Sequence, residues 1–235
     1  MATARARAWT PYAWIAGIVF VVALVAETGL SLAIPLNQDD TAAKIARELD
    51  KHRHLIVVVA TISALYVAAF PVYLVGLHQR LFADAGPHPA LGPLMLIGGS
   101  FFVALHAVSD VGIYLLLAGK LAAYSAQHDA GLAYLLYLLT FALDSVGDVF
   151  GSLFAFATGL AVLRSNALPR WLGRMALVIG ILLLAQAPML GGVVTPLGLL
   201  VDGLGFILLL VFVLVSSIVQ LRAGDVPANG ERANR

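Results

Sequence analysis

Long uninterrupted runs of apolar residues dominate the chain and alternate with short polar segments. A helix needs about 20 mostly apolar residues to cross the hydrocarbon core of a bilayer. Runs of this length predict six membrane spans. The fold class that follows is all-α: a polytopic membrane helix bundle forming a single domain over residues 1–221. The predicted spans cover approximately residues 12–34, 55–78, 91–119, 131–163, 172–190 and 193–221.

Two polar segments lie outside these spans. Segment 39–54 has acidic residues at its start and basic residues at its end, as a short helix prefers, and it would lie on the extracytoplasmic side between the first two spans. Ile45 and Leu49 give it one narrow apolar edge. It is either a lid over the outer mouth of the bundle or a solvated connector, and both interpretations stay open. Segment 222–235 is polar and rich in Gly, Pro and Asn, so we expect a disordered cytoplasmic tail.

The composition narrows the class of protein further. Hydrophobic residues make up 61% of the chain and charged residues 11%, which excludes an ordinary soluble domain. The formal net charge of +1 provides no basic face for nucleic acid. The chain has no cysteine, so disulfides and thiolate chemistry are excluded. We therefore expect an integral membrane protein whose partners are the lipid bilayer and a small ligand or ion.

Basic residues predict the orientation of the spans. The first apolar run is too long for a signal peptide, whose hydrophobic region has roughly 7 to 15 residues, so we expect a retained helix. Cytoplasmic loops carry the excess of Lys and Arg. With both termini cytoplasmic, the inside residues are Arg5, Arg7, Arg80, Arg164, Arg170, Arg174, Arg222, Arg232 and Arg235, and the outside residues are Lys44, Arg47, Lys51, Arg53 and Lys120.

Acidic side chains inside the apolar spans are the strongest indication of function. No Lys or Arg lies in the same spans to neutralise them. Each acid at the bilayer centre costs roughly 2.5 to 3.5 kcal/mol, so all of them together cost on the order of 10 to 15 kcal/mol. Such residues usually face the bundle interior or a water-filled cavity. The acids are Glu27, Asp110, Asp144, Asp148 and Asp202.

Helical geometry predicts that these acids share one layer. At about 1.5 Å of rise per residue, Glu27, Asp110 and Asp202 lie roughly 10 to 14 Å from the outer ends of their spans. Asp144 and Asp148 are four residues apart and hence on one helix face, and they continue this layer toward the midplane. The sequence therefore predicts an acid-lined pocket that opens toward the extracytoplasmic side.

Three classes of function are compatible with such a pocket. The leading one is binding or conduction of a proton, a metal ion or a small ligand by Glu27, His106, Asp110, Asp144, Asp148 and Asp202. Within this class, His106, Asp110, Asp144 and Asp148 form a donor set for a divalent cofactor such as Zn, Mn or Fe.

The alternative is an intramembrane enzyme that uses carboxylate acid/base or metal chemistry on a lipid or isoprenoid. The third is a structural membrane protein whose acids belong to a buried hydrogen-bond network. In the enzyme interpretation, aromatic side chains would line the pocket: Phe102, Tyr114, Tyr134, Tyr137 and Phe141.

One loop carries a resemblance to a known family. Residues 164–173 read Arg-Ser-Asn-Ala-Leu-Pro-Arg-Trp-Leu-Gly and precede a glycine-containing apolar helix. This loop resembles the connection in an uncharacterised family of bacterial multi-pass membrane proteins, and the six-helix plan is similar too. The resemblance implies a location in the bacterial cytoplasmic (inner) membrane and supplies no reaction or catalytic residue.

Overall fold

Helices form every regular element in the part of the chain that the computed structural model describes, which is residues 2–37, 39–82, 88–119, 124–125, 128, 130–165, 167–185 and 196–224. For residues 2–10, 196–199, 202, 223 and 224 only the backbone is described. The elements are α1 (Ala2–Ser31), α2 (Ala42–Lys51), α3 (Arg53–Leu81), α4 (Leu91–His106), η1 (Ala107–Ile113), α5 (Tyr114–Ala118), α7 (Ala130–Arg164), α8 (Arg170–Leu184) and α9 (Pro196–Gly224).

Five helical segments in the described residues are long and apolar enough to cross a membrane. The chain is thus an all-helical, multi-pass integral membrane protein, as its apolar runs predict. The third segment combines α4, η1 and α5 into one continuous rod. The five segments are Pro11–Ser31, Arg53–Leu81, Leu91–Ala118, Ala130–Arg164 and Gly203–Arg222.

The remaining predicted span, 172–190, corresponds in part to α8. This helix has 15 residues and is about 22 Å long at 1.5 Å per residue, which is less than the hydrocarbon core requires. Residues 186–190 lie outside the described residues. Helix α9 continues to Gly224, three residues into the segment predicted as a tail, and residues 225–235 lie outside the described residues.

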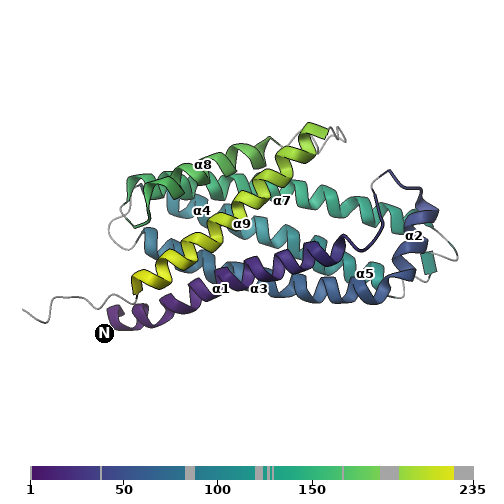
Figure 1. The fold of residues 1–235 in the computed structure, drawn as a ribbon, viewed down its shortest axis with the longest axis horizontal. Helices are drawn as coiled ribbons and strands as arrows, with labels where there is room; N and C mark the ends of the chain where they lie inside the picture. The colour runs from purple at the N-terminus through teal and green to yellow at the C-terminus, as the bar shows by residue number, and fades with distance from the viewer. Residues whose placement is uncertain are drawn as a thin grey trace, which may run out of the picture.

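The helices run antiparallel along one long axis (Figure 1). The start of α1 and the end of α9 lie at one end of the bundle, which we call the terminal end. The opposite end carries α2, α5 and the start of α7, and we call it the α2 end. Helix α1 packs against α3 and α9, while α7 packs against α4 and α8.

A large buried core fills the half of the bundle toward the terminal end. Phe70 of α3 lies at its centre, and its ring centroid is 5.0 Å from that of Phe20, 5.5 Å from Phe102 and 5.6 Å from Phe154. These distances are typical of favourable aromatic pairs. Because the four rings come from α1, α3, α4 and α7, this aromatic core joins four helices.

Glycines bring the helix backbones into close contact in the same half. A Cβ added at Gly98 of α4 would lie 2.5 Å from the backbone nitrogen of Phe154 on α7. Gly159 and Gly173 face one another in the same way, since a Cβ on either would lie 2.8 or 3.0 Å from the other's carbonyl oxygen. Small residues at helix contacts allow this close approach in membranes.

A second, smaller core, the cap cluster, lies at the α2 end. Ile45 and Leu49 of α2 are 0% and 1% exposed and belong to a cluster with Leu117 of α5 and Tyr137 of α7. The interpretation of segment 39–54 as a solvated connector is therefore wrong. A ten-residue helix with one apolar edge gains its stability by burying that edge, and here it covers the end of the bundle.

Local contacts stabilise the start of α2. The Lys44 Nζ lies 2.7 Å from Asp40 Oδ1, and the side chain of Thr41 accepts a hydrogen bond from the Lys44 backbone N–H as an N-cap. Hydrogen bonds from the Lys44 ammonium and the Asn37 backbone hold the pKa of Asp40 below its usual range. The local contacts thus define where the helix begins.

Candidate functional site

Asp110 lies in a π-helical segment that interrupts the third rod. The segment spans Ala107–Ile113, between the regular turns of α4 and α5. Single π-helical turns inside α-helices are rare and occur frequently at functional sites. The four-residue spacing of His106 and Asp110 predicts a shared face only for a regular helix, so the wider turn changes their relation. The pattern of apolar residues in the sequence gives no indication of this wider turn.

Both oxygens of the Asp110 carboxylate accept hydrogen bonds from side chains. The hydroxyl of Tyr66 on α3 donates to Oδ2, and the hydroxyl of Ser109 lies 3.0 Å from Oδ1 and donates to it. Tyr66 is 1% exposed and Ser109 is fully buried, whereas Asp110 is partly buried. A side chain from α3 and one from the same π-helical segment therefore hold this carboxylate in one orientation.

Glu27 and Asp144 bring two more carboxylates to the same region. The hydroxyl of Ser31 donates to Glu27 Oε1 at 2.8 Å, one turn along α1. Glu27 and Asp110 interact electrostatically with one another. Glu27, Asp110 and Asp144 all lie within electrostatic range of the hydroxyl of Tyr66. We call Glu27, Asp110 and Asp144 the carboxylate cluster; they come from α1, η1 and α7.

His106 lies beside this cluster. Its Nδ1 is 2.9 Å from the carbonyl oxygen of Phe102, and since a carbonyl only accepts, Nδ1 carries the proton. The ring packs against Gly147 of α7, where an added Cβ would lie 2.8 Å from His106 Cε1. His106 is buried and interacts electrostatically with Glu27. A side chain larger than hydrogen at position 147 would displace the imidazole.

The other two predicted acids have different positions. Asp148 is buried on α7, one turn from Asp144, and is 8% exposed. Asp202 lies on α9, but its side chain is outside the described part of the chain. No group of three or more His, Asp or Glu side chains among the described residues is arranged to hold a metal ion. The divalent metal predicted for His106, Asp110, Asp144 and Asp148 therefore gains no support from this geometry.

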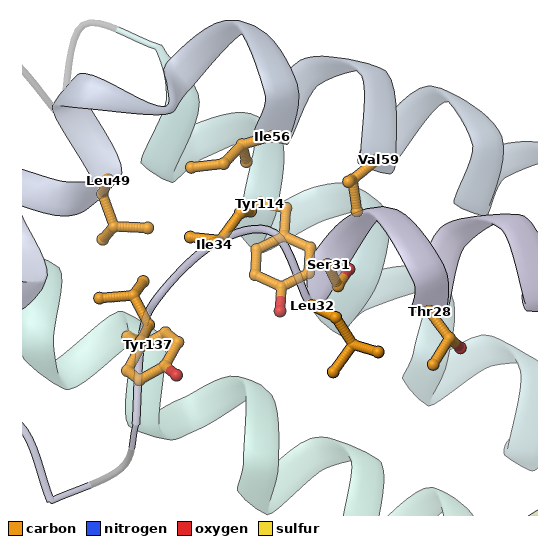
Figure 2. Close-up of a pocket in the computed structure, with 10 residues that line it drawn as sticks. Thr28, Ser31, Leu32, Ile34, Leu49, Ile56, Val59, Tyr114 and Tyr137 are labelled. Carbon is orange, nitrogen blue, oxygen red and sulfur yellow. The ribbon is translucent and has the colours of Figure 1, made fainter.

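A cavity of about 200 Å³ lies next to the carboxylate cluster, beneath α2. We call it the α2 pocket. It is partly open, and Figure 2 shows the rings of Tyr114 and Tyr137 among its lining side chains. Ser31 and Tyr114 connect it to the acids, because Ser31 binds Glu27 and Tyr114 lies within electrostatic range of all three carboxylates. The lining residues are Thr28, Ser31, Leu32, Ile34, Leu36, Leu49, Ile56, Val59, Tyr114 and Tyr137.

The enzyme interpretation expects five aromatic side chains around the pocket. Tyr114 and Tyr137 line this cavity, whereas the other three are not among its lining residues. Tyr66, which holds Asp110, was missed. A depth count would have found it, because Tyr66 lies about 11 residues into its span and Asp110 about nine residues from the same side of the membrane.

Comparisons of the chain with protein-family models, with curated proteins and with solved structures find no match. The resemblance of residues 164–173 to a bacterial membrane protein family therefore stays a prediction. In the structure, Pro169 directly precedes α8, and the exposed ring of Trp171 lies in its first turn. Anchoring of a loop at the membrane interface is sufficient to account for these residue types.

Proposed function

We propose that the carboxylate cluster and the α2 pocket together form a binding site for protons or a small ligand, reached from the extracytoplasmic side of the membrane. The observation that carries this proposal is the convergence of Glu27, Asp110 and Asp144 beside a cavity. Carboxylates that interact in a poorly solvated site do not all ionise together. Such a site binds protons, or it binds a cation that replaces them.

The contacts around the acids favour a binding site over a purely structural network. In a structural network, the acids would be fully buried and their partners would join the helices. Asp110 follows this pattern in part through Tyr66, but Glu27, Asp110 and Asp144 all keep partial exposure. Ser31 donates a hydrogen bond to Glu27, and Tyr114 lies within electrostatic range of all three acids. Both side chains also line the cavity.

The proposal includes six spans with both termini in the cytoplasm of a bacterium. The start of α1 and the end of α9 lie at the same end of the bundle, which requires an even number of crossings (Figure 1). In this proposal α8, which packs against α7 and α9, belongs to the sixth crossing. The excess of basic residues at the terminal end supports its cytoplasmic location.

Cysteine accessibility tests this proposal, because the natural chain contains no cysteine. Single variants Ser31→Cys and Val59→Cys place a thiol on the wall of the α2 pocket. Val22→Cys and Val25→Cys are matched controls on the exposed apolar face of α1. We expect a membrane-impermeant thiol reagent, applied to intact cells, to label the pocket variants at least about tenfold faster than the controls, since only a hydrated thiol ionises readily.

Two results would contradict the proposal. Equal protection of the pocket and control thiols would mean that water does not reach the cavity. Labelling of the pocket thiols only in inside-out membrane vesicles would reverse the orientation. A direct measure of binding is the proton uptake of the purified protein between neutral and acid pH, which should fall in the Glu27→Gln variant.

A further inference from the structure

The α2 pocket has a lining of two chemical kinds. Apolar side chains come from the end of α1, the chain after it, α2 and α3, and hydroxyl groups come from α1, α5 and α7. Two of the hydroxyl-bearing residues, Ser31 and Tyr114, lie next to the carboxylate cluster. A ligand that fits this lining has an apolar part and a polar end. The apolar lining residues are Leu32, Ile34, Leu36, Leu49, Ile56 and Val59.

Two tyrosine hydroxyls at this pocket have no hydrogen-bond partner within the described residues. Tyr137 is 5% exposed, and its ring and that of Tyr114 line the cavity (Figure 2). The tyrosines elsewhere in the bundle interior differ, because Tyr66 donates to Asp110 and Tyr73 lies 2.8 Å from the Ser216 hydroxyl. Tyrosine hydroxyls in protein interiors usually have a partner. A ligand with donor groups in the pocket would supply one here.

The charge around these hydroxyls selects the sign of the ligand. Asp110, Asp144 and Glu27 all act electrostatically on the hydroxyl of Tyr114, and the Tyr137 hydroxyl lies within electrostatic range of it. A carboxylate or phosphate ligand would add negative charge to this region and would be repelled. A cation would be stabilised by the acids and by the faces of the tyrosine rings.

We propose that the α2 pocket binds a small protonated amine with an apolar substituent. The N–H groups donate to the phenol oxygens of Tyr114 and Tyr137, the carboxylate cluster balances the charge, and the substituent packs against Ile56 and Val59. The cavity volume of about 200 Å³ lies below the roughly 300 to 1,000 Å³ of sites for drug-sized ligands, so the ligand is small. This inference rests on the proposed function and names its ligand class.

The test is calorimetric titration of the whole protein in nanodiscs of phosphatidylcholine with n-hexylamine at neutral pH. We expect saturable binding with one site per chain. Hexanol, which has a similar size and no charge, should bind at least about tenfold more weakly. Hexyltrimethylammonium keeps the charge but has no N–H group, so it should also bind more weakly than hexylamine.

Tyr137→Phe removes one hydroxyl and keeps the ring. A hydrogen bond to a charged group contributes about 1.5 to 3 kcal/mol, so we expect roughly tenfold or more weakening of hexylamine binding. Tyr73→Phe is the matched control, since it removes a buried hydroxyl of the aromatic core and should leave binding unchanged. This control also accounts for heat from amine that enters the lipid.

Three results would overturn the inference: equal hexylamine heats for wild type, Tyr137→Phe and Tyr73→Phe; equal affinity for hexanol and hexylamine; or no saturable binding at all. If the pocket cysteines are labelled while hexylamine does not bind, the inference of an amine ligand is wrong and the proposed hydrated site is still supported.

Nanodiscs containing phosphatidylethanolamine distinguish the sources of the amine. A lower apparent hexylamine affinity in them assigns the site to the lipid headgroup, and an unchanged affinity assigns it to a free amine.

Discussion

The aromatic core and the cap cluster are both apolar, but they are built from different side chains and have different neighbours. In the aromatic core, rings from four helices interlock and glycines bring helix backbones together. In the cap cluster, a short separate helix covers the bundle end, and a cavity remains beside it. The carboxylate cluster lies beside this cavity, whose lining combines apolar side chains with hydroxyl groups.

This difference teaches where a membrane bundle can keep an open site. Dispersion between closely packed side chains is the main attraction between helices in lipid, so a bundle that is open everywhere would separate. The closely packed half holds the helices together, and the other half is therefore free to leave space around polar groups. The comparison leads to three tests, ordered by the size of the expected effect.

Truncating one buried leucine in each cluster tests whether the two clusters unfold together. Leu77 and Leu49 are 0% and 1% exposed. We expect Leu77→Ala in the aromatic core to lower the free energy of unfolding of the bundle by about 2 to 5 kcal/mol. Leu49→Ala should act mainly on the docking of α2, which is measured as faster hydrogen exchange of the α2 amides with a smaller shift of the global unfolding midpoint. Equal global shifts would show that the two clusters form one cooperative unit.

Adding a methyl group at a glycine tests the close packing of the terminal half. Gly98→Ala would place its Cβ 2.5 Å from a backbone nitrogen of α7, so α4 and α7 must separate. We expect a loss of about 1 to 3 kcal/mol, measured by denaturation in mixed micelles.

Gly29→Ala is the matched control, because no atom of another helix among the described residues lies within 4 Å of the added Cβ. It should stabilise its helix by up to about 1 kcal/mol. A destabilisation by Gly29→Ala of similar size to that by Gly98→Ala would show that loss of glycine itself, and not the contact with α7, is the cause.

Removing one tyrosine hydroxyl from each half of the bundle tests whether a charged acceptor makes the hydrogen bond of Tyr66 stronger than that of Tyr73. Tyr66→Phe removes a hydrogen bond to a carboxylate, and Tyr73→Phe removes one to a serine hydroxyl. Hydrogen bonds to ionised groups are roughly twice as strong as neutral ones, so we expect losses of about 1.5 to 3 and 0.5 to 1.5 kcal/mol. The Tyr66→Phe loss should therefore exceed the Tyr73→Phe loss, measured as the free energy of unfolding of each variant. Equal losses for the two variants would argue against a charged acceptor for the Tyr66 hydroxyl.

Particular residues show how far sequence reasoning reaches for the site. Glu27 and Asp110 were predicted to share a depth, and the structure places them within electrostatic range of one another. The count worked because helical rise is constant along a span. Tyr66 was not predicted, since a single tyrosine in an apolar helix gives no periodic signal. The π-helical turn at Asp110 was not predicted either, because it changes backbone hydrogen bonding without changing the composition.

The sequence by itself determined that this is a membrane protein made of helices, because a bilayer requires every spanning backbone group to bond within its own helix and allows only long apolar runs. It also predicted a shared depth for Glu27 and Asp110, which lie within electrostatic range of one another. The tertiary structure alone decided that α2 folds onto the bundle end, that Tyr66 binds Asp110, and that a cavity with two unpaired tyrosines lies among the described residues beside the acids. These features depend on how each helix is rotated about its axis and on which helices it contacts. Side-chain packing between helices determines both, and the sequence of a single helix does not.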